Sequence, residues 1–552
     1  MAILSELRRQ GRNDEVWQMC CGYTDLTLEQ FMAIQKRLLL EQLELLNNCP
    51  LGAKVMRGAK PQSVEEFRQR VPLTTYSDYC PELLEKREDI LPAKPMAWIR
   101  TSGKSGEFPC KWVPMTPAFS KELCLVIYGV CNFANCQDRG KIDFPQRVRF
   151  FNTMAPPPYA SGVITSMMGQ VTEMELIPSM EDALRLPFEE RMALGFKQAL
   201  SKGFDYSIGL SVVLVTVGEK FGQSSKKPSI LPLLSQPRAL LRILKGVAKS
   251  KLARRPMLPR DLWSPKGIVT GGLDSMIYRD KLKELWGKYP LEMYMGSEGG
   301  VLAAQLWDFG DMSFIPNLNF LEFIPEGENF KWQLDHSYQP KTVLLDEVKA
   351  GENYELVLTN FHGGAMTRYR VGDMVRITSL RNEALGIDIP QMSFFGRADG
   401  IIDFGVTRLT EKTIWQAIQN TGIPYEDWVA RKEIKEGMVL NIYIELKDGE
   451  HASDTEIAEA ISKQLKQLDS SFVATHNDVG SYLDFNVEVK TLPRGSFAAY
   501  ISQKRAEGAE MAHLKPAHIN PSDEVLSLLQ AEPSPVEIRT KGETKADSVS
   551  VK

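Results

Sequence analysis

The segment from Tyr354 to Arg376 joins an apolar run, which predicts a buried strand, to an acidic side chain in a glycine-containing turn. Its second half reads Tyr369-Arg-Val-Gly-Asp373, and glycine and aspartate both favour turn positions. The Asp373 carboxylate could accept two hydrogen bonds from a ribose diol, as an acidic residue does in dinucleotide-binding folds. The segment therefore indicates nucleotide binding, and the alternative is an ordinary turn.

A loop of small residues, Thr101 to Gly106, follows a predicted strand over 96–100. Small residues let backbone N–H groups converge on phosphate oxygens, and hydroxyl groups add donors. The loop is not a Walker A motif, which needs a glycine five residues before Gly103, where this chain has Trp98. Lys111 is near enough in sequence to contact the same phosphates; the alternative is a solvated surface lysine. The candidate phosphate-binding residues are Thr101, Ser102, Gly103, Lys104, Ser105, Gly106 and Lys111.

The segment Tyr294-Met-Gly-Ser-Glu298 reads as a strand end that opens into a turn, because Gly299 and Gly300 follow it. Tyr294 could stack on a purine, and the Glu298 carboxylate could hold Mg²⁺ through hard oxygen ligation. The alternative is a buried tyrosine beside a surface glutamate. Taken together, the three segments supply groups that bind one ligand, ATP.

Composition excludes several other classes of protein. The 552 residues exceed what one hydrophobic core serves, so two or more domains are expected. The formal net charge of -4 gives no general attraction to nucleic acid. All eight cysteines lie in the first quarter of the chain and all six histidines lie after residue 330, which gives no zinc-ligand spacing.

The elements that must position these groups follow from periodicity. Apolar residues at helical spacing predict a helix over 26–48, with Gln42 as a polar gap in the stripe. The apolar positions of that helix are Leu28, Phe31, Ile34, Leu38 and Leu45. Predicted strands over 148–151 and 212–216 then mix with a predicted helix over 279–285, as in an α/β domain.

A separate small unit is predicted near the C-terminus. It contains a strand over 439–446, a helix with apolar Ile457, Ile461 and Leu465, and a strand over 483–489. The amino terminus lacks the apolar core of a secretory signal, and the apolar run 208–217 is far shorter than the ~20 residues that span a bilayer. We therefore expect a soluble, cytoplasmic protein.

The three segments, in this order, resemble the signature loops of the adenylate-forming superfamily. Their detailed sequences are similar to those of one branch, the auxin-responsive Gretchen Hagen family of acyl-acid amido synthetases. Further family landmarks are 71–83, 317–325, 352–359, Gly495-Ser-Phe and Lys515-Pro516. The resemblance implies a large α/β N-terminal domain over 1–399 that binds ATP and the acyl group, and a small mobile α+β lobe over 400–520. The tail 521–552 is expected to be disordered.

The resemblance also implies roles for individual residues. Lys111, Glu298 and Lys515 are the expected catalytic residues, with Glu298 as the Mg²⁺ ligand; Lys515 contacts the nucleotide in one state of the mobile lobe, and a structural lysine is the alternative. The expected nucleotide-binding residues are the 101–106 loop, Gly271, Gly272, Tyr294, Ser297, Asp373, Arg397 and Arg408. Two positions depart from the family pattern: Lys104 stands in place of Thr or Ser, and Arg408 in place of a lysine.

The implied reaction begins when a substrate carboxylate attacks the α-phosphate of Mg-ATP and expels pyrophosphate. The acyl-adenylate then passes its acyl group to an amino acid and releases AMP. One alternative is an acyl-CoA ligase that shares the first step, and another, which Lys104 suggests, is a non-catalytic nucleotide-binding protein. No motif identifies the base of the second step, the acid substrate or the acceptor.

One segment, 238–255, matches no family landmark. It interleaves basic residues with Leu, Ile and Val, as a helix lying on an anionic membrane or covering an acyl pocket does. The favoured interpretation is a solvated cationic face on a helix that packs on the core.

Overall fold

A computed structural model describes residues 3–101, 110–223, 236–271, 278–335, 337–397, 401–404, 407–434, 437–447, 449, 452–468, 485–506, 516 and 518–532. The described chain divides into two compact units. The large unit ends at Thr410 and the small unit begins at Glu411. The expected boundary at 399/400 lies eleven residues earlier than this division.

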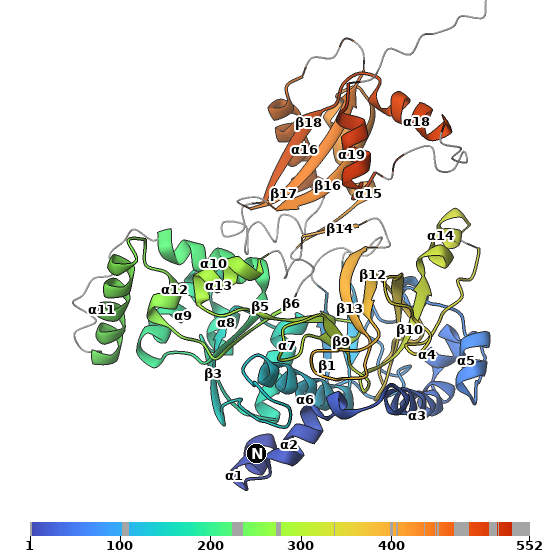
Figure 1. Cartoon of the computed structure of the whole chain (residues 1–552). Coiled ribbons are helices and arrows are strands. Elements are labelled where there is room, and N and C mark those ends of the chain that lie inside the picture. Colours follow the sequence, from blue (N-terminus) through green and yellow to red (C-terminus); the bar gives the residue numbers. More distant parts are fainter. Residues whose placement is uncertain are drawn as a thin grey trace, which may run out of the picture. The chain divides into compact units, whose positions relative to one another are not determined.

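Within its described residues, the large unit is built on one mixed sheet of eleven strands (Figure 1). Strands β4, β3, β5, β6 and β7 run parallel, and every pairing from β7 to β10 is antiparallel. The order across the sheet is β10 (Asn319–Pro325), β11 (Asn353–Asn360), β12 (Tyr369–Ser379), β13 (Gln391–Arg397), β9 (Met312–Phe314), β8 (Gly300–Ala304), β7 (Leu291–Gly296), β6 (Gly267–Gly271), β5 (Tyr206–Leu210), β3 (Arg147–Asn152) and β4 (Glu173–Ile177). Because β6 and β7 are parallel, their carboxyl ends share one edge, where Gly271 and Glu298 lie.

Helices cover this sheet, and two short hairpins complete the unit. Figure 1 shows α9 to α13 gathered at the β3–β5 side, and α3, α5 and α14 at the β10 side. The helices are α1 (Ile3–Arg9), α2 (Asn13–Cys20), α3 (Leu28–Asn47), α4 (Pro50–Val55), α5 (Val64–Arg70), α6 (Pro117–Phe133), α7 (Ala160–Met167), α8 (Met180–Arg185), α9 (Phe188–Lys202), α10 (Ser211–Gln223), α11 (Pro237–Leu252), α12 (Pro259–Leu262), α13 (Arg279–Trp286) and α14 (Glu326–Leu334). The hairpins are β1 (Ala97–Arg100) with β2 (Trp112–Met115), and β14 (Ile401–Asp403) with β15 (Arg408–Thr410). No helix among the described residues has the length and apolar character needed to cross a bilayer.

The sequence predicted some of these elements and misassigned one. Strand 148–151 and helix 279–285 are confirmed within β3 and α13. The predicted strand over 212–216 is wrong, because these residues lie in α10. A short apolar run fits a buried strand and a buried helix equally well. The structure shows a helix, α10, which packs against β5, α12 and α13.

Helix α3 confirms the predicted helix over 26–48 and explains its polar gap. Thr27 caps its first turn by accepting a hydrogen bond from the Gln30 backbone N–H. Phe31 and Leu38 are buried as expected, but Leu45 is 40% exposed, so its assignment to the buried stripe is wrong. Gln42 is buried instead.

Replacing Gln42 with leucine is expected to lower the free energy of unfolding by about 2–4 kcal/mol. The Gln42 side-chain amide donates to the Gly364 carbonyl at 2.9 Å and accepts from the Gly363 N–H at 2.8 Å, so leucine would leave two buried backbone groups unpaired. Denaturant unfolding measures the loss. Glu44→Leu, at an exposed position of the same helix, is the control and should be near neutral; an equal loss in both variants would contradict the assignment.

The small unit is a three-stranded sheet with helices, in the order β16 (Tyr425–Ile434), β17 (Met438–Leu446) and β18 (Phe485–Thr491). Its described helices are α15 (Glu411–Thr421), α16 (Asp454–Leu468), α18 (Ser496–Ala506) and α19 (Asp523–Gln530). The predicted helix with Ile457, Ile461 and Leu465 is confirmed as α16, with all three buried. Leu526 and Leu529 of α19 are also buried, so the predicted disorder of 521–552 does not hold for 523–530.

A histidine in the small unit gives a prediction of pH dependence. His518 stacks on Trp428 with ring centroids 4.7 Å apart, and its ring nitrogens lie 2.9 Å from Asp427 Oδ1 and 2.7 Å from Glu411 Oε1. Hydrogen bonds to Asp427 and Glu411 raise the pKa of His518 to about 9 from its ordinary value of 6.5.

Because this folded-state pKa is raised, the stabilisation is complete below pH 6.5 and is lost as pH rises through about 9. We expect the melting temperature of the protein to exceed that of His518→Gln near pH 6.5 and the two to converge above pH 9. Thermal denaturation of both proteins across this range measures the difference. A difference that stays constant with pH would show that the charge of His518 contributes nothing.

Candidate active site

Lys111 is held in place by the end of the β1–β2 hairpin. The Thr101 N–H donates to the Lys111 carbonyl, and the Lys111 N–H donates to Thr101 Oγ1, both at 3.0 Å. These bonds extend the hairpin one step beyond the pairing of Arg100 with Trp112. Both residues are buried, with 4% and 7% exposure. Ser102, Gly103, Lys104, Ser105 and Gly106 lie outside the described residues.

The Lys111 ammonium contacts the side chains of Glu298 and Tyr369, and we call these three residues the Lys111 cluster. Tyr369 is buried, and the Glu298 side chain is 13% exposed. Lys111 Nζ donates to Glu298 Oε1 at 3.1 Å and to the Tyr369 hydroxyl at 2.7 Å. The Tyr369 hydroxyl lies 3.2 Å from the same Glu298 oxygen. Three segments far apart in the sequence therefore meet in one charged group.

The charge state of the Lys111 cluster follows from its surroundings. Burial alone would raise the pKa of Glu298, but Lys111 and Arg408 outweigh it, so the pKa of this carboxyl is lowered. Burial and the neighbouring Glu298 carboxylate raise the pKa of Tyr369 well above its usual value. Near neutral pH the cluster thus holds an ionised carboxylate and a neutral phenol. Arg408, in β15, contributes positive charge here, and its contact with the nucleotide stays a prediction.

Buried amides fix the turn that carries Glu298. The Asn360 amide donates to the Glu298 carbonyl at 2.9 Å, and the Asn319 amide donates to the Gly299 carbonyl at 2.6 Å. Gln35, from α3, donates in turn to the Asn319 carbonyl at 2.6 Å. A Cβ at Gly299 would lie 2.7 Å from Leu358 Cδ2, so a side chain there would force the buried Leu358 to shift. Ser297 lies in the same turn and is partly buried.

Asp373 lies within strand β12, so the predicted turn is wrong. Gly372 has a positive φ of 78°, and the register of β12 against β13 shifts between Met374 and Val375. These irregularities explain why glycine and aspartate stand together inside a strand. Asp373 is paired directly with Arg397 across the two strands.

A second buried group, the Asp373 cluster, forms around that pair. Arg397 Nη1 donates to Asp373 Oδ1, and the Tyr294 hydroxyl donates to Asp373 Oδ2 at 2.5 Å. Asp373 and Tyr294 are buried, with 7% and 6% exposure. Burial, followed by the Asp373 carboxylate, raises the pKa of Tyr294 well above its usual value. The structure thus makes Tyr294 a fixed hydrogen-bond donor; its stacking on a purine stays a prediction.

The two clusters belong to one site because the same two segments supply both. Tyr294 and Glu298 stand at the end of β7, while Tyr369 and Asp373 stand four residues apart on β12. Gly271 ends β6 at this same edge of the sheet, paired with Met293 of β7. Gly272 and Lys515 lie outside the described residues. Tyr369 and Asn360 both lie in the segment 354–376 that indicates nucleotide binding, and Gln35 lies in the predicted helix over 26–48, but no local pattern assigned a role to any of the three.

The residues present fit a metal held mainly by a bound nucleotide. Among the described residues, no group of three or more His, Cys, Asp and Glu side chains could enclose a metal ion. Glu298 offers one ionised carboxylate. Mg²⁺ is commonly bound in this way, by one or two carboxylates together with substrate phosphates and water.

Two family models match the chain. The model of the GH3 family N-terminal domain matches residues 24–154, and that of the GH3 family central domain matches residues 312–397. The first range contains Lys111, and the second contains Tyr369, Asp373 and Arg397. A jasmonoyl–L-amino acid synthetase of Nicotiana attenuata, JAR4, is 30% identical over 282 residues, which is 48% of this chain and 45% of that protein. The chain therefore spans about half the length of this curated relative.

Solved structures share the fold at low sequence identity. The AtGH3.15 acyl acid amido synthetase in complex with 2,4-DB superposes with a TM-score of 0.50 at 16% identity, covering 92% of this chain and 94% of its own. A 2-hydroxyisobutyryl-CoA ligase in its thioester-forming state gives 0.54 at 14% identity, covering 85% and 87%. The fold thus occurs in proteins of both kinds, one forming amides and one forming thioesters.

Proposed function

We propose that the chain is a member of the GH3 family, two of whose domain models match it, and that it is an ATP-dependent acyl-acid amido synthetase, which adenylates a carboxylic acid and conjugates it to an amino acid. The observation that carries the proposal is the pair of buried clusters at the carboxyl edge of β6 and β7. They place a lysine, an ionised glutamate and an aspartate where ligands bind in open α/β sheets.

Each cluster has a distinct role in this proposal. Lys111 binds the phosphates, and Glu298 orients its ammonium and supplies the protein ligand to Mg²⁺. Mg²⁺, when bound, neutralises phosphate charge and orients the leaving pyrophosphate. Asp373 accepts hydrogen bonds from the ribose, because an ionised carboxylate has about four acceptor positions and two are used by Tyr294 and Arg397. The loop 101–106, with Lys104, and Gly271 and Gly272 are proposed to line the phosphates and the base.

The reaction proceeds in two balanced steps. A carboxylate oxygen of the acid forms a bond to the α-phosphorus of ATP while the bond to pyrophosphate breaks. The amine of the amino acid then forms a bond to the acyl carbon while AMP leaves, and the amine loses a proton to solvent or a base. The site accelerates the first step by positioning and charge neutralisation.

The proposal extends to the rest of the chain and to its place in the cell. Residues 1–399 bind ATP and the acyl group, while the lobe 400–520 moves between the two steps and brings Lys515 to the nucleotide in one of them. We propose that the protein acts in the cytoplasm.

ATP–pyrophosphate exchange tests the proposal across a panel of aromatic, terpenoid and fatty acids. Any acid that supports exchange is then incubated with ATP and either mixed amino acids or CoA, and the product is identified by mass spectrometry. An amide is expected. A CoA thioester would replace the synthetase with a ligase, and ATP binding with no exchange for any acid would favour a non-catalytic nucleotide-binding protein.

A further inference from the structure

Helix α11 exposes an apolar stripe to solvent, which is unusual for a helix that also packs on a core. Leu241, Leu244 and Leu252 are 58%, 57% and 89% exposed. The buried residues of the same helix are Ala239, Gly246 and Ser250, and at 3.6 residues per turn they lie on the opposite side. The predicted helix is thus confirmed over 238–252 but not over 253–255, and Leu241, Leu244 and Leu252 face away from the core.

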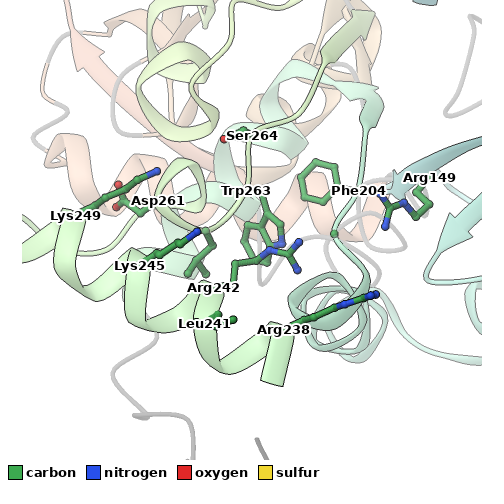
Figure 2. A pocket seen from close by; sticks show the side chains of 12 residues that line it. Arg149, Phe204, Arg238, Leu241, Arg242, Lys245, Lys249, Asp261, Trp263 and Ser264 are labelled. Carbon is green, nitrogen blue, oxygen red and sulfur yellow. The ribbon is translucent and has the colours of Figure 1, made fainter. Parts of the chain in front are cut away.

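A basic cavity of about 540 Å³ lies along one flank of this stripe. Arg238, Arg242, Lys245 and Lys249 of α11 line it, and Arg149 lines it from β3 (Figure 2). Phe204, Leu262 and Trp263 supply apolar lining, and Leu241 belongs to both the cavity and the stripe. The positively charged lining of the cavity is therefore directly adjacent to the exposed leucines.

The cavity carries an excess of positive charge that its own acids do not balance. Asp261 lines it, but both of its oxygens bind Arg255, at 2.7 and 2.8 Å. Asp205 pairs with Arg149 at 3.2 Å. Arg242 donates to the Ala199 carbonyl at 3.1 Å, which orders its guanidinium without neutralising it. Among the residues that the structure describes, Arg238, Lys245 and Lys249 make no ion pair.

The cavity is separate from the candidate active site. Phe204 precedes β5, and Trp263 and Ser264 precede β6, so the cavity lies at the amino ends of the parallel strands. The Lys111 and Asp373 clusters lie at the opposite, carboxyl edge. The strands between them are about five residues long, which separates the two sites by roughly 15 Å or more.

We propose that α11 docks the protein on an anionic phospholipid surface, with the leucine stripe entering the interface and lipid phosphates entering the basic cavity. The surface of α11 complements such an interface in both charge and apolar character. An interfacial helix combines apolar residues on one face with Lys and Arg beside them, and each Lys or Arg near an anionic surface adds to the attraction. A soluble phosphate compound would use the cavity but would leave the three leucines uncovered.

Vesicle sedimentation of the full chain tests this proposal. The protein is expected to sediment with vesicles of phosphatidylcholine and phosphatidic acid, but not with phosphatidylcholine alone. The double variant Lys245→Glu with Lys249→Glu should lower the partition coefficient at least about tenfold, and Leu244→Asn with Leu252→Asn should lower it severalfold. Lys36→Glu with Lys60→Glu, exposed elsewhere on the large unit, makes the same change in net charge and should leave partitioning unchanged.

Two outcomes would overturn the proposal. Equal losses in the α11 and control variants would mean that binding follows net charge alone. The second outcome uses glycerol 3-phosphate, which carries the phosphate without acyl chains. Titration calorimetry measures binding of this compound. If the protein binds glycerol 3-phosphate, the Lys245→Glu, Lys249→Glu variant does not, and the protein never sediments with vesicles, then the cavity binds a soluble phosphate compound and not a membrane. Circular dichroism of each variant, whose changes are all at exposed positions, confirms that it is folded.

Discussion

Replacing Glu298 with alanine is expected to lower the rate of acid-dependent ATP–pyrophosphate exchange by about 10²-fold or more. The change removes the proposed protein ligand to Mg²⁺. It also removes the carboxylate that holds the Lys111 ammonium at 3.1 Å, so two contributions to the same step are lost together. Initial rates of exchange at saturating ATP and acid measure the effect.

The glutamine variant separates charge from shape at this position. Glu298→Gln keeps a hydrogen-bond acceptor for Lys111 and Tyr369 but removes the negative charge that a metal requires. We expect it to fall close to the alanine variant in activity while melting at a temperature closer to that of the unchanged protein. Near-wild-type exchange in either folded variant would contradict the role of Glu298.

Replacing Asp373 with alanine is expected to lower the adenylation rate by about 10²-fold, mainly through weaker use of ATP. The change removes the proposed partner of the ribose diol. It also leaves the guanidinium of Arg397, whose side chain is 6% exposed, buried without its counter-ion. Exchange rates measured across ATP concentrations separate the rise in KM from the fall in the maximal rate.

Asp373→Asn is the matched control for that structural disturbance. Asparagine keeps the size of the side chain and one acceptor oxygen, but it loses the charge that pairs with Arg397. If Asp373 binds ribose, the asparagine variant should fold and still show a raised KM for ATP. A folded variant of either kind with an unchanged KM for ATP would remove Asp373 from the nucleotide site.

Local patterns in the sequence predicted many elements of the fold. The helical spacing of Phe31 and Leu38 predicted α3, and the same spacing of Ile457, Ile461 and Leu465 predicted α16. Residues 212–216 were misassigned because an apolar run of this length has no period that separates strand from helix. The segment forms α10, which contacts α12 and α13 from later in the chain, and contacts between distant segments are not encoded in local spacing.

The sequence pointed to four residues of the candidate site, but not to their pairings. Lys111, Tyr294, Glu298 and Asp373 each stood in a segment that indicated nucleotide binding. Their partners did not follow from spacing, because Lys111 and Glu298 are 187 positions apart in sequence, one at the end of the β1–β2 hairpin and the other after β7, and only the tertiary fold brings them together. Gln42 is a further case: the sequence showed only a gap in a stripe, whereas its buried amide binds a glycine loop.

The measurement that tests the central claim most directly follows oxygen from the acid to the nucleotide. A substrate acid found in the exchange panel is labelled with oxygen-18 in its carboxylate and converted to product with unlabelled ATP, and AMP and phosphate are examined by mass spectrometry. Adenylation predicts one labelled oxygen in AMP and none in phosphate. Label in inorganic phosphate, formed together with ADP, would show attack at the γ-phosphate and would contradict the account.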